Sequence, residues 1–169
     1  MLTPEEIIEL LKLEPLPLEG GLYRQSYVAG EKIAAEALPM RYGRAKPLCT
    51  AIYYLLTDQP NSFSALHRLP TDEVYHFYLG DRVEMLLLHP EGRSEIIKLG
   101  HDLLLGEHVQ YVVPAGVWQG SRLAEGGHSA LMGTTMAPGY DDIDYQPGSA
   151  EELELLYPDR SELVRSLAR

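Results

Sequence analysis

Two short stretches of the sequence carry the side chains best suited to proton transfer. The first contains His67, Glu73 and Tyr75, and the second ends at Gln119. A histidine imidazole titrates near neutral pH, so it can remove a proton beside a carbonyl group, and a phenol such as Tyr75 can return one. A carboxylate at Glu73 would orient the imidazole or adjust its protonation. We therefore take His67, Glu73 and Tyr75 as candidate catalytic residues.

Strand periodicity decides which of these side chains can meet. Successive side chains of a strand point to opposite faces, so Glu73 and Tyr75 share one face and His76 points away from them unless a bulge intervenes. The same rule places His67 and Leu69 on one face. His76 is a candidate ligand-binding residue, with a second-layer or interface position as the alternative. For Glu73 the alternative is a solvated turn residue.

Four further residues are candidates for ligand binding. Tyr23 and Arg24 lie in an alternating segment that follows a glycine pair, although most of the 11 tyrosines must be structural. Trp118 and Gln119 follow the turn at residues 114–116, where ligand binding and packing inside a barrel explain them equally well.

The elements that would position these residues are short strands. Glycine, proline and aspartate, which supply the conformations of tight turns, separate apolar segments along most of the chain. We expect strands at 22–28, 50–56, 63–69, 73–79, 83–89, 95–99, 108–113, 118–123 and 129–136. This spacing predicts a mainly β fold, either a sandwich or a barrel.

Short helices are expected at both ends of the chain. Thr3 with Glu6 has the spacing of a capping box, as do Ser149 with Glu152 and Asp159 with Glu162. We predict helical additions at 3–13 and 149–168 around a core at about 20–145. With a length of 169 residues, the chain is expected to form a single domain over 1–169.

Composition excludes several classes of function. A formal net charge of −11 argues against nucleic-acid and anionic membrane surfaces as partners, because both attract lysine and arginine. Cys49 is the only cysteine, so no intrachain disulfide can form. The chain begins without the basic and apolar run of a signal peptide. We expect a cytoplasmic protein with a small-molecule ligand.

The two stretches resemble the motifs of the cupin superfamily. The first cupin motif has His-x-His, a glutamate a few residues later and a glycine at the following hairpin. The second has Pro-x-Gly and a histidine three positions after the glycine. Here His67, Glu73 and Gly80 fall at the spacing of the first motif, and residues 114–116 match the start of the second.

The resemblance narrows to a family of unassigned function labelled cupin type five. It is carried by the segments at 20–24, 50–54, 64–80, 114–120 and 137–140. Such a resemblance implies a double-stranded β-helix, or jelly-roll, barrel with a ligand in its open mouth. It also implies that two copies often pair as a homodimer.

The departures from the cupin motifs concern the metal ligands. Leu69 stands where metal-binding cupins have the second histidine of the first motif, and Gln119 stands where they have the late histidine. Protein-bound transition metals usually need three or four good donors. We therefore expect no cofactor, or at most a weakly bound divalent metal. If one binds, its ligands would be His67, Glu73, Gln119 and, through a bulge, His76.

Three functions remain open from the sequence. The first is a metal-independent isomerase or epimerase that acts on a sugar or nucleotide-sugar, by analogy with metal-free sugar epimerases of the same fold. The second is a non-catalytic module that binds or senses a metabolite. The third is a metal-dependent oxygenase or isomerase.

Overall fold

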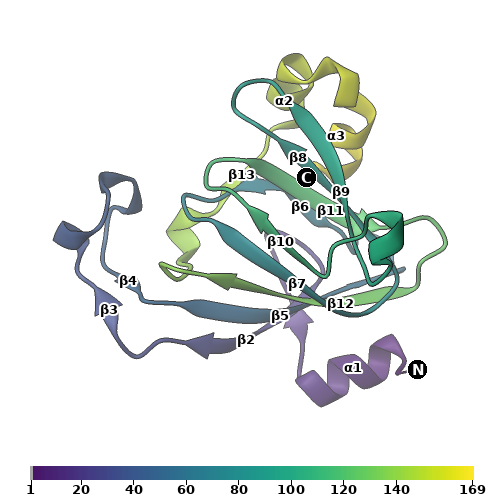
Figure 1. Cartoon of the computed structure of the whole chain (residues 1–169), viewed down its shortest axis with the longest axis horizontal. Helices are drawn as coiled ribbons and strands as arrows, with labels where there is room; N and C mark the ends of the chain where they lie inside the picture. The colour runs from purple at the N-terminus through teal and green to yellow at the C-terminus, as the bar shows by residue number, and fades with distance from the viewer. Residues whose placement is uncertain (1) are drawn as a thin grey trace.

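Residues 2–169 are described by the computed structural model, in which two antiparallel β-sheets face each other (Figure 1). The larger sheet has the strand order β1-β2-β5-β12-β7-β10, and the smaller has the order β13-β6-β11-β8-β9. Neighbouring strands often come from distant parts of the sequence, as in the two sheets of a jelly roll. The predicted double-stranded β-helix fold is therefore confirmed.

All the strands expected between residues 50 and 136 are present, with ends displaced by at most two residues. The strands of the larger sheet are β1 (Glu14–Pro15), β2 (Leu22–Val28), β5 (Thr50–Thr57), β7 (Glu73–Gly80), β10 (Gln110–Val113) and β12 (Ser129–Met136). Those of the smaller sheet are β6 (Ser64–Arg68), β8 (Val83–Leu88), β9 (Ser94–Leu99), β11 (Trp118–Leu123) and β13 (Gln146–Pro147).

The helices are α1 (Pro4–Leu11), α2 (Ala150–Leu156) and α3 (Ser161–Leu167). Thr3 caps α1 in a capping box with Glu6, and Ser149 caps α2, as the sequence predicts. The third expected cap is wrong: Asp159 lies inside a 3-10 turn, η5 (Pro158–Arg160), and α3 begins after it without a side-chain cap. No helix within residues 2–169 is both long and apolar enough to cross a bilayer.

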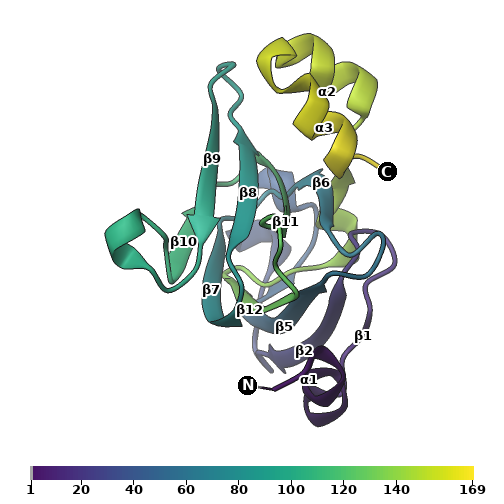
Figure 2. The same cartoon turned by 90° about the vertical axis from the view of Figure 1, so that its right-hand side faces the viewer.

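The helices cover the outer faces of the barrel (Figure 2). The first, α1, packs against the larger sheet through Ile7, which joins Leu13, Leu55 and Leu131 in a buried cluster. On the other side, α2 and α3 cover the smaller sheet. Their contacts form a second cluster of Leu66, Leu86, Leu88, Leu153, Tyr157, Val164 and Leu167.

The interior of the barrel is packed with apolar side chains at one end and hollow at the other. Inward-facing residues of both sheets form the packed end: Tyr54, Leu56, Tyr75, Phe77, Val83, Met85, Leu87, Ile97, Leu99, Val113, Val117, Ala130 and Met132. Because the same strands continue past this cluster, the inward positions toward the other end of the barrel are free to line a cavity.

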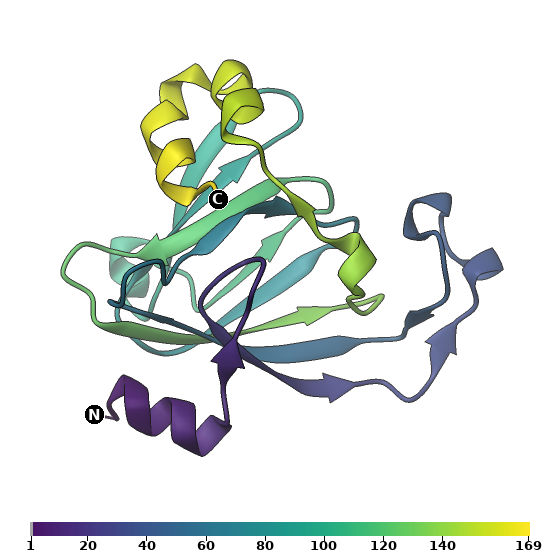
Figure 3. The same cartoon turned by 180° about the vertical axis from the view of Figure 1, so that it is seen from behind.

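An arm at residues 29–48 extends from the hollow end of the barrel (Figure 3). It contains the short strands β3 (Lys32–Ile33) and β4 (Lys46–Pro47) and two 3-10 turns, η1 (Ala35–Ala37) and η2 (Met40–Tyr42). A second segment at this end, residues 137–148, contains η4 (Asp142–Asp144) and is named the mouth segment below. The remaining 3-10 turn is η3 (Leu103–Leu105).

Candidate functional site

The hollow end of the barrel holds a cavity of about 680 Å³. Its walls come from both sheets, from the loop before β2 and from the mouth segment. The lining residues are Leu16, Pro17, Leu18, Glu19, Tyr23, Gln25, Thr50, Ala51, Ile52, His67, Leu69, Glu73, Thr134, Met136, Tyr140, Asp141, Asp142 and Tyr145. This volume accommodates a small organic ligand such as a monosaccharide.

His67 lies on β6 and faces this cavity, although only 1% of its surface is exposed. Its Nδ1 lies 2.7 Å from the carbonyl oxygen of Ala65. A carbonyl can only accept, so Nδ1 carries a proton and donates it, and in the neutral ring Nε2 is left with a lone pair. Nε2 is 4.0 Å from Oε2 of Glu19, another lining residue. The ring of Tyr145 stacks on the imidazole, with centroids 5.0 Å apart.

Glu73 and Gln119 form a buried pair beside His67. Gln119 is opposite His67 in the β11–β6 register, and its Nε2 donates a hydrogen bond of 2.7 Å to Oε2 of Glu73. Burial raises the pKa of Glu73, and the negative charge of Glu19 raises it further, while the proximity of His67 lowers it. The structure thus brings His67, Glu73 and Gln119 together, with Gln119 reaching the cavity through its contact with Glu73.

The raised pKa of Glu73 predicts a pH-dependent gain in stability for Glu73→Gln. A carboxyl group with a higher pKa in the folded state stabilises the fold only while it is protonated, and that contribution is lost as pH rises through the folded pKa. The variant has no such loss, so its free energy of unfolding should exceed that of the wild type at neutral pH. Denaturant unfolding across pH should show the advantage shrinking toward acid, and a difference independent of pH would contradict the assignment.

Tyr75 is placed deeper than a proton donor to the cavity should be. It lies on the inward face of β7 with Glu73, as predicted, but only 1% of it is exposed and it packs in the core cluster. Burial raises its pKa well above the ordinary value, and the charge of Glu73 adds to this effect. Among the described residues the tyrosines that line the cavity are Tyr23, Tyr140 and Tyr145.

Two other candidates, Arg24 and Trp118, differ from expectation because they lie outside the cavity lining. Arg24 is next to Tyr23 in β2 and therefore faces away from it, with its guanidinium over the ring of Tyr53. Trp118 faces outward from β11 against the C-terminal helices, with Arg68 stacked over its indole at 4.6 Å. Both positions follow from strand alternation.

His76 also points away from the cavity. Its Nε2 is 3.2 Å from Oγ1 of Thr135, its Nδ1 is 3.2 Å from Nε2 of Gln110, and its ring is stacked on Tyr78. A register shift does occur where β7 pairs with β12, but it falls after His76, between the partners of Phe77 and Leu79. The bulge that would turn His76 inward is therefore not at the position needed.

Sequence reasoning missed the residues that close the mouth of the barrel. Glu19 comes from the loop between β1 and β2, and Tyr140, Asp141, Asp142 and Tyr145 come from the mouth segment. The sequence signal for the second group was the run at residues 140–145, in which acidic and aromatic side chains are concentrated. Neither segment lies in a long strand, so periodicity could not direct its side chains inward.

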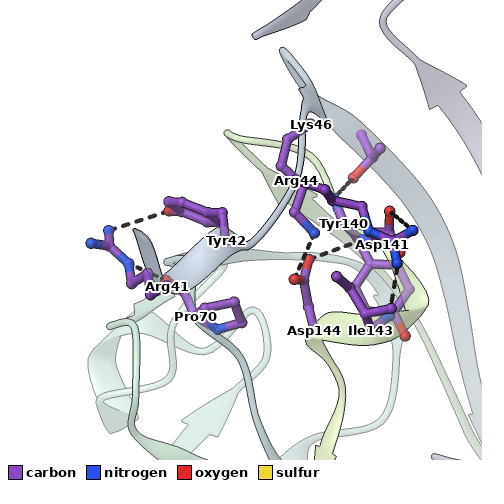
Figure 4. A network of polar contacts seen from close by, with 10 residues as sticks. Arg41, Tyr42, Arg44, Lys46, Pro70, Tyr140, Asp141, Ile143 and Asp144 are labelled. Atoms are coloured by element: carbon purple, nitrogen blue, oxygen red, sulfur yellow. Dashed lines mark hydrogen bonds and ion pairs between the residues drawn. The ribbon is translucent and has the colours of Figure 1, made fainter. Parts of the chain in front are cut away.

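A network of polar contacts ties the mouth segment to the base of the arm (Figure 4). Lys46 of β4 is fully buried, and its Nζ lies 2.6 Å from Oδ1 of Asp144. The other carboxylate oxygen of Asp144 accepts a hydrogen bond of 3.1 Å from the backbone N–H of Asp141. The side-chain carboxylate of Asp141 lies 3.5 Å from the guanidinium of Arg44. Because Tyr145 follows Asp144 directly, this network holds Tyr145 over His67.

The donors around His67 fit a transition-metal site poorly. No cluster of three or more His, Cys, Asp or Glu side chains within residues 2–169 has the arrangement of a metal site. Leu69 lines the cavity where a ligating imidazole would be needed, and the amide N–H of Gln119 already occupies one oxygen of Glu73. His67 remains with the carboxylates of Glu73 and Glu19, and within residues 2–169 these side chains do not form the cluster of three or four donors that a tight site needs.

Titration with zinc or manganese should therefore shift the melting temperature little. A metal that binds only the folded state stabilises it by RT ln(1 + [L]/Kd), which is about 2.7 kcal/mol at 100 times Kd. Calorimetric melting with and without each metal measures this effect. About one equivalent of bound metal, lost on His67→Ala, would contradict the prediction.

Comparison with known proteins gives relatives that share this architecture throughout. A family model described as Cupin superfamily (DUF985) matches residues 5–147. The crystal structure of protein SO0799 from Shewanella oneidensis is 32% identical, has a TM-score of 0.85, and is matched over 100% of this chain and 99% of its own. A hypothetical protein from Leishmania major is 28% identical with a TM-score of 0.86, and 99% of each chain is covered.

Two further matches are less complete. The uncharacterized protein YML079W of Saccharomyces cerevisiae is 31% identical over 124 residues, which is 70% of this chain and 61% of that protein. The chain thus spans less than two thirds of this curated relative. Oxalate decarboxylase from Bacillus subtilis is described with Mn(II) centres. It is 15% identical to this chain with a TM-score of 0.51, and the match covers 92% of this chain and 37% of the decarboxylase chain. This is a likeness of fold alone.

Proposed function

We propose that this chain, which belongs to the Cupin superfamily (DUF985), binds a small oxygen-rich molecule of the sugar class in its cavity. The bound molecule is isomerised by proton transfer through His67. The fold provides the cavity, and the function must be argued from the side chains within it. The steps below concern this chain's own residues only.

The tautomer of His67 carries the proposal. Since Nδ1–H is held by the carbonyl of Ala65, the ring is fixed in orientation and its other nitrogen is available as a base. Burial to 1% exposure and the stacked ring of Tyr145 limit access of bulk water to the imidazole. An oriented imidazole in a partly closed cavity is suited to removing a proton from carbon beside a carbonyl group.

A tyrosine of the mouth is better placed than Tyr75 to return the proton. Tyr140 and Tyr145 both line the cavity, and partial burial raises the pKa of each phenol well above its ordinary value. Both therefore stay protonated through the neutral range and keep a proton available to a carbanion-like intermediate. Glu73, held by Gln119, would act on the charge and position of His67 rather than on the substrate.

The lining favours an uncharged or positively charged ligand over a nucleotide-sugar. Among residues 2–169, those that line the cavity include no lysine or arginine. A diphosphate needs such side chains or a helix N-terminus to offset its charge. We therefore propose a free sugar or related polyol, whose hydroxyl groups can donate to the acceptors of the cavity.

Solvent exchange tests this function. The protein is incubated in deuterated water with a panel of neutral aldoses and ketoses, and proton NMR follows the C–H groups next to the carbonyl carbon. We expect protein-dependent loss of one C–H signal for at least one sugar, together with a rise in melting temperature. A rise without exchange would favour a non-catalytic binding module, and neither effect with any sugar would overturn the proposal.

A further inference from the structure

The charge of the cavity is negative without a compensating cation in its lining. Glu19, Glu73, Asp141 and Asp142 all line it, whereas the lining residues of the described chain include no lysine or arginine. One of these carboxylates, Asp141, is paired with the guanidinium of Arg44 at 3.5 Å. The carboxylates of Glu19, Glu73 and Asp142 have no lysine or arginine partner among residues 2–169, and Glu19 has only the imidazole of His67 at 4.0 Å.

A buried acceptor without a donor lies next to Glu73, on Gln119, which is not itself a lining residue of the cavity. Oε1 of Gln119 is buried without a hydrogen-bond partner in the described part of the chain, although only 2% of this residue is exposed. The lone pair at Nε2 of His67 lies on the side of Glu19, with the two atoms 4.0 Å apart. Because His67 lines the cavity, its Nε2 can accept a hydrogen bond from an N–H or O–H group of a ligand.

The carboxylates of Glu19 and Glu73 repel each other when no cation lies between them. Burial and the charge of Glu19 both raise the pKa of Glu73, so the ionised form of this carboxyl group is disfavoured. Ser64 donates to Oε1 of Glu19 at 2.6 Å, and Gln119 donates to Oε2 of Glu73 at 2.7 Å, which fixes both groups on the cavity wall. A cation placed between them would remove the repulsion.

We infer that the ligand of this cavity is a polyhydroxylated amine, such as an amino sugar, whose protonated amino group lies between Glu19 and Glu73. An ammonium group supplies one positive charge and three donors, which matches the carboxylates of Glu19 and Glu73 together with the lone pair of His67. Tyr23 of β2 and Tyr145 of the mouth segment also line the cavity, and tyrosine rings attract cations. The inference rests on the proposed function, because it names the substrate class of the same site.

Matched pairs of sugars test the inference. Calorimetric titration compares glucose with glucosamine, galactose with galactosamine and mannose with mannosamine, at a pH where the amines are protonated. N-acetylglucosamine serves as a control in which the nitrogen is present and uncharged, and glucose 6-phosphate serves as an anionic control. We expect at least one amino sugar to bind about tenfold tighter than its neutral partner, and no measurable binding of the phosphate.

Variants test which carboxylate recognises the ammonium group of the ligand. Glu19→Gln should remove most of the preference for the amine, measured as the ratio of the affinity for each amino sugar to the affinity for its neutral partner. Glu151→Gln, an acidic residue exposed on α2, is the matched control and should leave the preference unchanged. Melting curves for both variants establish that they fold.

The outcomes separate this inference from the function on which it rests. Neutral sugars that bind as tightly as their amines in all three pairs, or a preference that persists in Glu19→Gln, would overturn the inference and leave the proposed function standing. If no sugar of either kind binds or exchanges a proton, both are wrong.

Discussion

Replacing Lys46 with methionine is expected to lower the free energy of unfolding by about 3–5 kcal/mol, the usual cost of leaving one member of a buried ion pair without its partner. Lys46 is 0% exposed and Asp144 is 7% exposed, with 2.6 Å between Nζ and Oδ1. In the variant the carboxylate of Asp144 would keep only the backbone N–H of Asp141 as a donor. Denaturant unfolding at neutral pH measures the loss.

A double variant separates the unpaired charge from lost packing. Lys46→Met combined with Asp144→Asn removes both charges and leaves an amide that can still accept from the backbone of Asp141. It should recover much of the stability lost in the single variant. If Lys46→Met alone is as stable as the wild type, the pair does not hold the mouth segment, and the position of Tyr145 over His67 needs another explanation.

The fold was predictable because its information is local and repetitive. Between residues 50 and 136 each strand alternates inward and outward side chains and ends at a turn residue, so both the existence and the facing of strands could be inferred. Gly80 illustrates the turn chemistry: its φ is 105°, and a Cβ there would lie 2.2 Å from the carbonyl oxygen of Ser129. At the C-terminus the prediction failed at Asp159, because a 3-10 turn displaced the start of the last helix.

The candidate site was predictable only as far as the strands extend. Alternation placed His67 and Glu73 on inward faces, and it placed His76 on the outward face of β7. The family motif suggested Gln119, and the structure shows it bound to Glu73. For Arg24 and Trp118, residue type suggested ligand binding although their neighbours Tyr23 and Gln119 occupy the inward positions, which is a failure to apply the same rule.

The charge of the site could not be predicted, because it depends on segments without periodicity. Glu19 reaches the cavity from a loop 48 positions before His67, as the printed numbering shows, and Asp141 and Asp142 reach it through a 3-10 turn. Their positions result from tertiary contacts such as the pairing of Lys46 with Asp144, which joins residues 98 positions apart. Only the folded chain shows that these acidic groups line one cavity together with His67.

His67→Gln is expected to reduce solvent-proton exchange into a bound sugar by about 10²–10⁴-fold, the usual contribution of a positioned general base. Glutamine fills much of the space of histidine, but an amide cannot accept a proton near neutral pH. In this variant the exchange rate measured by NMR should therefore fall strongly, whereas the affinity for the sugar measured by calorimetry should change far less.

Tyr145→Phe is the matched control for His67→Gln, because it keeps the ring that stacks on the imidazole and removes only the hydroxyl group. A smaller loss of exchange in this variant would assign the phenol to the return of the proton, whereas an unchanged rate would leave that role to Tyr140 or Tyr23. Exchange at the wild-type rate in a folded His67→Gln protein would show that His67 is not the base. If His67→Gln fails to fold and the wild type responds to no sugar, the histidine is structural, because its hydrogen bond to Ala65 and its stacking on Tyr145 would then account for its burial.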